Sequence, residues 1–262
     1  MLRYLRLLGI QMRASALVSM QYRLDFVLDA LSSFYWAAGG VMPLFVMFGQ
    51  RTRVAGWTWP EALVVVAFFT LLKGVLEVAI QPSLSNVIEH IRKGTLDFIL
   101  IKPVDAQFMV STSRFELFKA SNMIGGVVLL IWAMHLVGRW PSPLGLLLTA
   151  TLLLSSALIL HSIWILVVSL AFFVVKIDNL VFLFASIYDA ARYPSSVFRG
   201  ALSILFTFVI PLAVMTTFPA LALLGKLGPM QAAGAFGGSI LFALAARTLW
   251  LRALRHYTSA GG

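Results

Sequence analysis

The chain has 262 residues, of which 60% are hydrophobic and 11% are charged, and its mean hydropathy is +0.94. Soluble domains carry about a quarter charged residues, so this composition excludes a soluble globular protein and indicates a chain that crosses a membrane several times. The net charge of +10 would suggest nucleic acid for a soluble chain. Here membrane topology explains it, and we expect no nucleic-acid partner. Without cysteine, the chain has no disulfide, thiolate metal site or cysteine nucleophile.

Residues 1–25 carry arginines among Leu, Met and Tyr. Arg13 and Arg23 interrupt any apolar core of a signal peptide, and no small-residue cleavage site follows. Segregated apolar and basic side chains are typical of a helix that lies in the interface of an anionic leaflet. We therefore predict an interfacial helix at 1–25, with a basic, unfolded tail as the alternative.

Apolar segments long enough to cross a bilayer follow at about 26–48, 62–80, 115–136, 144–175 and 229–250. The region 179–225 admits two interpretations. In the first, 179–197 is the fifth span and 200–225 is a helix pair, broken at Pro211 and Pro219, that enters and leaves the outer leaflet. In the second, 179–199 lies on the cytoplasmic surface and 201–224 crosses. Both predict an all-α membrane protein with six membrane-embedded helical segments.

Basic residues orient the chain, because cytoplasmic loops carry an excess of Lys and Arg. Most basic residues precede the first span, lie between the second and third, or follow the last. The opposite side receives only Arg51, Arg53, Arg139 and Lys226. We therefore expect both termini, and the segment between the second and third spans, in the cytoplasm.

That segment, at 82–105, is a charged insert in an apolar sequence. Its apolar residues recur at helical spacing, opposite a polar face. Pro82 and Ser83 suit a helix start and Gly94 a helix stop. The insert thus predicts a short amphipathic helix on the cytoplasmic side, with a polar face available for contact with another component.

Two parts of the sequence resemble type-2 ABC exporter permeases. The first is Ile91-Arg92-Lys93-Gly94-Thr95-Leu96-Asp97, followed by Leu100, Lys102-Pro103-Val104 and Gln107. The second is similar to the C-terminal half of one bacterial branch of the family, and comprises Tyr193-Pro194, Phe198-Arg199-Gly200, the run FTFVIP at 206–211, Phe218-Pro219-Ala220 and Leu224-Gly225. Together these motifs follow the family in order and spacing over nearly the whole chain.

The resemblance implies that 1–262 is a single permease domain of a bacterial cytoplasmic membrane. It implies an interfacial helix at 1–25, a coupling helix within 82–105 that docks on a separate ABC ATPase, itself a dimer, and an outer re-entrant pair at 200–225. It therefore favours the first interpretation of 179–225. The residues expected to couple to the ATPase are Glu89, Ile91, Arg92, Lys93, Gly94, Leu96 and Asp97.

The same resemblance places the pathway between two permeases, and we expect a heterodimer, with a homodimer as the alternative. Candidate gate residues on the outer side are Phe206, Phe208, Pro211 and Phe218. Lys73 and Glu77, four residues apart in the second span, are either a polar patch on the pathway or a mutually neutralising structural pair. Asp189 and Arg192 have the same two interpretations.

The chain has no GxxxxGK[ST] phosphate-binding loop, so ATP and Mg²⁺ belong to the partner ATPase and we expect neither enzymatic activity nor a cofactor here. The four histidines lack metal-ligand spacing, and His161 suits a hydrogen bond between helices better than a proton relay. The expected cargo is a lipid-like or amphipathic molecule, or a glycan. An ATP-independent transporter or channel is the alternative, which the lack of an internal repeat disfavours.

Overall fold

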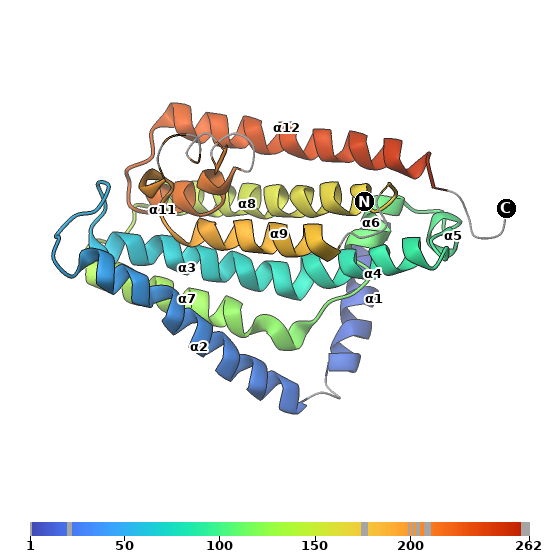
Figure 1. Cartoon of the computed structure of the whole chain (residues 1–262), viewed down its shortest axis with the longest axis horizontal. Coiled ribbons are helices and arrows are strands. Elements are labelled where there is room, and N and C mark those ends of the chain that lie inside the picture. Colours follow the sequence, from blue (N-terminus) through green and yellow to red (C-terminus); the bar gives the residue numbers. More distant parts are fainter. Residues whose placement is uncertain are drawn as a thin grey trace.

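The computed structural model describes residues 2–19, 23–173, 178–198, 200, 202, 205–206 and 211–257. These residues are helical apart from turns and connections, and they form no β-strand (Figure 1). The long helices lie along one another in a bundle; they are α2 (Arg23–Phe48), α3 (Trp59–Val75), α7 (Ser121–Val137), α8 (Pro143–Leu170) and α12 (Pro229–Leu254).

Five helical stretches of the described residues are long and apolar enough to cross a membrane, and they correspond to the five predicted spans outside 179–225. The expected count of six is not confirmed. Helix α9 (Asp178–Asp189) has 12 residues and reaches about 18 Å, short of the roughly 30 Å of hydrocarbon in a bilayer. The short η3 (Ala190–Arg192) and η4 (Ser195–Val197) follow it.

Helix α3 lies at the centre of the bundle because its sequence is apolar on every side. All residues from Ala62 to Phe69 are buried, as is Thr70, whose hydroxyl donates to the Val66 carbonyl at 2.8 Å. Helices α2 and α7 pack on one side of α3, while α8 and α12 pair with each other on the other side (Figure 1). A helix that is apolar all round is stable only in such a buried position.

Glycines set the distance between α3 and α7. A Cβ atom at Gly126 would lie 2.6 Å from the backbone N of Leu71, and one at Gly74 would lie 2.5 Å from the backbone N of Met123. Small residues let helix backbones approach closely inside a membrane, where packing replaces the hydrophobic effect as the main attraction between helices. Gly125, by contrast, has open space where its Cβ would be.

The helix of the second span does not end at the membrane. From α3 the chain continues through a π-helical segment, η1 (Leu76–Ile80), into α4 (Gln81–Arg92), so the helix is continuous from Trp59 to Arg92. The α-helical geometry of α4 does start at Gln81, with Pro82 in its first turn, as predicted, but no break separates α4 from the helix before it. The helix stop at Gly94 is confirmed, since α4 ends at Arg92.

Pro82 is accommodated because a distant segment replaces its missing donor. Proline has no N–H to offer to the Val78 carbonyl four residues before it, and its ring crowds that carbonyl. The Glu116 N–H donates to Val78 O instead, at 2.9 Å. Next to it, Ser83 Oγ donates to Arg114 O at 2.6 Å and accepts from Arg114 N at 3.1 Å. The proline thus creates the binding site for the connection into α7.

A second proline, Pro219, also follows a π-helical segment, near the other end of the bundle. The π-helical η6 (Ala213–Thr217) runs directly into α11 (Phe218–Leu223), so the chain stays helical through Pro219, where a break was predicted. Val214 O lies 3.2 Å from Ser156 Oγ of α8, whose hydroxyl also donates to Leu152 O at 2.7 Å, so the contact with Val214 is the weaker of the two. The rest of the predicted re-entrant pair, including 207–210, lies outside the described residues, so the re-entry stays a prediction.

Helix α1 (Leu2–Ser19) crosses the bundle end instead of joining it (Figure 1). It buries none of its residues, and Ser15 Oγ ties it to the bundle by accepting from the Phe115 N–H at 3.1 Å. A helix thus lies beside the spans where one was predicted, while its location in a membrane interface stays a prediction. Helices α1 and α4 and the C-terminal end of α12 lie at one end of the bundle, and the 49–58 and 138–142 loops at the other.

The Gly126→Ala variant should lose stability, because the new methyl group would collide with backbone atoms of Leu71 that cannot rotate away. Such overpacking costs about 1–3 kcal/mol. The neighbouring Gly125→Ala is the control, since its methyl group meets open space and alanine favours a helix by about 1 kcal/mol. Thermal unfolding in a mild detergent measures both, and equal midpoints for the two variants would contradict the close α3–α7 contact.

Candidate coupling surface and its attachment to the bundle

The end of α4 is fixed by a glycine in the left-handed region. Gly94 has φ +64°, and its N–H donates to Ile91 O at 3.2 Å. The Thr95 N–H donates to His90 O at 2.9 Å, and the two side chains add a hydrogen bond of 2.8 Å between Nδ1 and Oγ1. This pair of backbone bonds is the Schellman arrangement, in which a residue other than glycine would be strained. The turn therefore has one defined shape.

After the turn, a single helical turn, α5 (Asp97–Leu100), presents an apolar outer side. Leu96 and Ile99 point into the core and are 0% and 8% exposed. Phe98 and Ile101 point away from it and are 67% and 76% exposed. Two large apolar side chains three residues apart on a surface turn are costly in water, and they suit contact with another protein.

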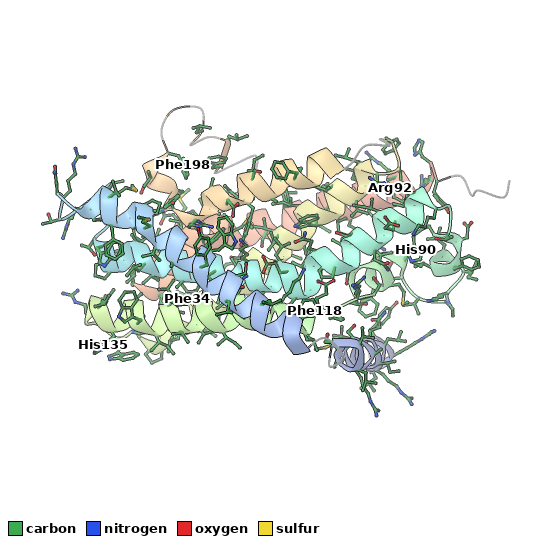
Figure 2. The ribbon with its side chains drawn as sticks, turned by 60° about the horizontal axis from the view of Figure 1, so that its bottom comes forward. Phe34, His90, Arg92, Phe118, His135 and Phe198 are labelled. Carbon is green, nitrogen blue, oxygen red and sulfur yellow. The ribbon has the colours of Figure 1, made fainter. Side chains whose placement is uncertain are left out.

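Charged groups surround this apolar pair. Glu89 and Lys93 form an ion pair of 2.7 Å along α4, with side chains 53% and 69% exposed. Arg92 and Lys102 are exposed too, and Asp97 opens α5 half-buried. His90 and Arg92 lie at this end of the molecule in Figure 2, far from Phe198. We call Glu89, Arg92, Lys93, Phe98 and Ile101 the coupling surface.

The coupling surface shares Glu89, Arg92 and Lys93 with the set of residues expected from the sequence, and the other members differ. Leu96 was expected to contact an ATPase, but it is fully buried, and Ile91 packs against the core. Both therefore shape the surface from within. Phe98 and Ile101 were missed, although helical spacing from the buried Leu96 and Ile99 would have placed them on the opposite face. The expected polar members and Gly94 do lie together here.

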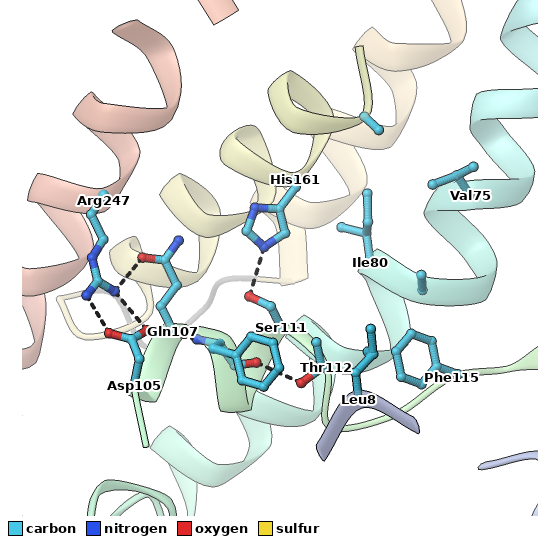
Figure 3. Close-up of a pocket in the computed structure, with 13 residues that line it drawn as sticks. Leu8, Val75, Ile80, Asp105, Gln107, Ser111, Thr112, Phe115, His161 and Arg247 are labelled. Carbon is cyan, nitrogen blue, oxygen red and sulfur yellow. Dashed lines mark hydrogen bonds and ion pairs between the residues drawn. The ribbon is translucent and has the colours of Figure 1, made fainter. Parts of the chain in front are cut away.

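An ion pair ties the following segment to the last span (Figure 3). Asp105 caps α6 (Ala106–Ser111) by accepting from the Phe108 N–H at 3.0 Å. Arg247 of α12 donates to both carboxylate oxygens of Asp105, at 3.2 and 2.5 Å, and to Gln107 Oε1 at 2.9 Å. This fork of bonds holds the segment around Asp105 against α12 with a fixed orientation.

The pKa of the Asp105 carboxyl reflects this arrangement. Partial burial alone would raise it, but the hydrogen bonds from Arg247 and from the Phe108 N–H, with the attraction of the guanidinium charge, outweigh burial and lower the pKa below its ordinary value. Asp105 is therefore ionised throughout the physiological pH range, and the ion pair is present there.

Beside the ion pair lies a cavity of about 590 Å³ between α1, η1, α6, α8 and α12 (Figure 3). Its lining is mostly apolar, with Leu8, Ile80 and Phe115 among the walls. His161 of α8 reaches into it and shares a hydrogen bond of 2.8 Å with Ser111 Oγ. That contact joins two helices, as the sequence suggested for this histidine. No group of three or more His, Asp or Glu side chains among the described residues is placed to hold a metal ion.

Residues 34–261 match the family described as ABC-2 family transporter protein. The chain belongs to the ABC-2 transporter family. It is therefore an integral membrane protein of the permease kind, and permeases of this family work with an ATPase partner. Comparison with curated proteins and with solved structures returned no match.

In this ABC-2 permease the intramembrane charges are placed apart from the coupling surface. Glu77 accepts from Asn122 Nδ2 of α7 at 2.6 Å. Lys73, one turn earlier, lines a small pocket together with Asn122 and Arg192. The Arg192 guanidinium lies 4.9 Å from the centre of the Phe69 ring and 3.7 Å from Asp189. Both suspected pairs thus meet around α3, although they are far apart in sequence.

The candidate gate residues of the permease are only partly described. Phe206 is buried and meets Phe198 edge to face, with ring centres 4.9 Å apart. Pro211 is buried and Phe218 packs against the core, whereas Phe208 lies outside the described residues. Nearby, Trp57 Nε1 donates to Ser196 Oγ at 3.0 Å and Lys226 pairs with Glu61 at 2.7 Å, so polar contacts link neighbouring segments at this end of the bundle.

The Arg247→Gln variant should unfold at a lower temperature than the wild type at pH 7, because it removes the charge that keeps Asp105 ionised. A lowered carboxyl pKa contributes stability above the unfolded pKa, about 3.9, and the contribution disappears as pH falls through the folded value. The gap between variant and wild type should therefore close only below about pH 3.9.

Thermal unfolding at pH 7 and at pH 3 in the same detergent measures the gap. Arg252→Gln, which alters an exposed arginine of the same helix, is the matched control and should change little at either pH. A gap for Arg247→Gln that is as large at pH 3 as at pH 7 would exclude the ion pair as its cause.

Proposed function

We propose that this chain is the membrane subunit of an ATP-driven exporter, and that a separate dimeric ABC ATPase docks on the coupling surface. Membership of the ABC-2 family supports the ATPase partner. The observation that carries the proposal is the continuous helix from Trp59 to Arg92, which joins the centre of the bundle to the coupling surface. The nucleotide and Mg²⁺ bind to the partner, because this sequence has no phosphate-binding loop.

The continuous helix gives the ATPase a mechanical connection to the spans. Its 34 residues reach about 51 Å, so a shift at the coupling surface reaches the far end of α3 without crossing a flexible joint. Ile99 and Leu96 fix α5 to the core beneath the exposed Phe98 and Ile101. The π-helical η1 is the place where this helix can change its winding, since π-helical turns inside α-helices are rare and frequently lie at functional sites.

A second connection runs through Asp105 and Arg247 to α12. The coupling segment is thus attached to two spans, the central α3 and the outer α12. Displacement of the segment by an ATPase would tilt these two spans relative to one another. Such rigid-body movement about packed interfaces is the usual basis of alternating access.

The assembly that we propose contains two permeases, in a heterodimer or a homodimer, in a bacterial cytoplasmic membrane. One bundle of five or six spans is small for a pathway, and an axis between two bundles supplies the space. The excess of basic residues at the α1 and α4 end supports a cytoplasmic location of that end and of both termini. The exported molecule is lipid-like, amphipathic or a glycan.

Ile101→Ser and Phe98→Ser should each weaken association with the ATPase by about 10- to 100-fold, because burial of a large apolar side chain contributes about 1.5–3 kcal/mol. Met230→Ser is the matched control: it exposes a hydroxyl in place of an exposed apolar group at the other end of the bundle. Copurification of the ATPase, and its hydrolysis rate in the complex, are the measurements.

Glu89→Ala with Arg92→Ala should have a smaller effect, since exposed ion pairs contribute about 0–1 kcal/mol. Unchanged association of both serine variants would move the docking site away from Phe98 and Ile101. A permease that purifies with a second permease but with no ATPase under any condition would refute the exporter.

Cysteine labelling tests the orientation, because the chain has no cysteine of its own. Arg53→Cys and Lys102→Cys introduce single thiols at opposite ends of the bundle, and both positions are exposed. An impermeant maleimide added to intact cells should label position 53 and not position 102, and the reverse should hold for inverted vesicles. Labelling of both from the same side would overturn the assigned topology.

A further inference from the structure

An apolar groove of about 630 Å³ runs between α2 and α7, which lie side by side in Figure 2. Phe34 and Phe45 of α2 form one wall, and Val128 and Trp132 of α7 form the other. All four side chains are exposed, Phe34 by 77%. The groove therefore offers a chain-shaped hydrocarbon surface that no other described part of the protein covers.

The floor of this groove is polar. Ser33 of α2 and Ser121 of α7 share a hydrogen bond of 3.0 Å, and Thr70 and Asn122 lie beside them. Thr70 and Asn122 also line a second, smaller pocket on the other side of α2. Thr70 and Asn122 therefore form a boundary between the two spaces. The groove on one side of this boundary is apolar and open, and the pocket on the other side is polar.

The smaller pocket has two cations in its lining, Lys73 and Arg192. Two carboxylates lie just outside that lining: Asp189 is 3.7 Å from Arg192, and Glu77 accepts from the lining residue Asn122 at 2.6 Å. The pocket has a volume of about 20 Å³, which holds one water-sized group. Within the described part of the chain, the Lys73 ammonium group has no ion pair or hydrogen bond of its own. An ammonium group without a partner at this depth attracts an anionic atom, because the surrounding dielectric constant is low.

The depth of the pocket distinguishes it from an ordinary lipid contact. Lys73 lies about 21 Å along the helix axis from Trp59, which the aromatic-belt rule places at the outer interface. The roughly 30 Å of hydrocarbon then extends past Lys73 towards the cytoplasm. A resting phospholipid keeps its head group outside that layer, so an anion at Lys73 belongs to a molecule in transit.

We propose that the groove and the pocket together form the binding site for the exported substrate, an anionic amphiphile. Its hydrocarbon chain lies between α2 and α7, and one anionic oxygen reaches Lys73 and Arg192 beneath α2. This assignment rests on the exporter proposed above and narrows its substrate class. It disfavours a free glycan, because the described side chains of the two groove walls are apolar and the polar groups are confined to the floor.

The first test measures lipid binding to the purified permease alone, in a neutral detergent, by native mass spectrometry. Lysophosphatidylglycerol is the anionic probe, and a monoacylglycerol with the same acyl chain, which has no phosphate group, is the uncharged one. The wild type should prefer the anionic lipid by about tenfold, as expected for a close charge pair in a medium of low dielectric constant. Lys73→Gln should abolish the preference and Lys73→Arg should keep it.

Lys119→Gln is the matched control for charge, since Lys119 pairs with Glu116 and does not line either space. It should keep the preference. Equal binding of the two lipids to the wild type, or an unchanged preference in Lys73→Gln, would overturn the proposal.

A second pair of variants tests the groove. Val128→Trp fills it, whereas Val127→Trp adds the same bulk at an exposed neighbouring position outside the lining. Val128→Trp should reduce binding of both lipids at least fivefold, and Val127→Trp should leave it unchanged. If Val128→Trp instead dissociates a permease dimer in the same spectra, the groove is an interface between permeases and the proposal is wrong.

Hydrolysis by the complete complex in phosphatidylcholine vesicles separates this proposal from the exporter function. Lysophosphatidylglycerol should stimulate the wild-type complex and not the Lys73→Gln complex. Binding without stimulation in an assembled, hydrolysing complex would make the site a structural lipid site, and the substrate assignment would fall while the exporter stands. If the permease assembles with no ATPase, both the exporter function and the role of this site in export are refuted. Lipid binding to the permease alone would then still show whether the groove and the pocket bind an anionic amphiphile.

Discussion

Pro82 removes a backbone donor from the helix that joins the bundle centre to the coupling surface, and the Glu116 N–H replaces it at 2.9 Å. Without that bond the carbonyl of the buried Val78 would lose a hydrogen bond, and a buried polar group without a partner is costly. The replacement keeps the helix continuous to Arg92, and it fixes where the chain re-enters the bundle towards α7. The position of the coupling surface therefore depends on the replacement of the missing Pro82 donor by the Glu116 N–H.

A π-helical segment also precedes Pro219 at the opposite end, where Ser156 Oγ of α8 lies 3.2 Å from Val214 O. In both places a residue distant in sequence contacts a carbonyl of the π-helical segment. Proline in a membrane helix thus acts as a docking point for another element. It specifies a tertiary contact, because only a neighbouring group can satisfy the exposed carbonyl.

The charges inside the bundle and the charges on the coupling surface have different surroundings. Glu77 and Arg192 are held by Asn122 and by the Phe69 ring, whereas Glu89 and Lys93 are exposed. Exposed pairs contribute little to stability and remain available to a partner. Buried cations keep a strong field that only an anion or a nearby dipole can neutralise. This division separates a surface for protein contact from a site for a small charged group.

Composition, span length and the distribution of Lys and Arg determined from the sequence alone that this is an all-helical membrane protein, and Gly94 marked the end of α4. These properties depend on local periodicity and on the free energy of transferring each side chain into lipid. Both are set by the residues themselves and not by their tertiary contacts. Only the tertiary structure decided that the helix continues through Pro82 and that Leu96 is buried while Phe98 is exposed. The same holds for the ion pair between Asp105 and Arg247. Each of these features depends on a residue that is distant in the sequence. Local spacing does not tell which distant donor, apolar side chain or charge will contact a given residue.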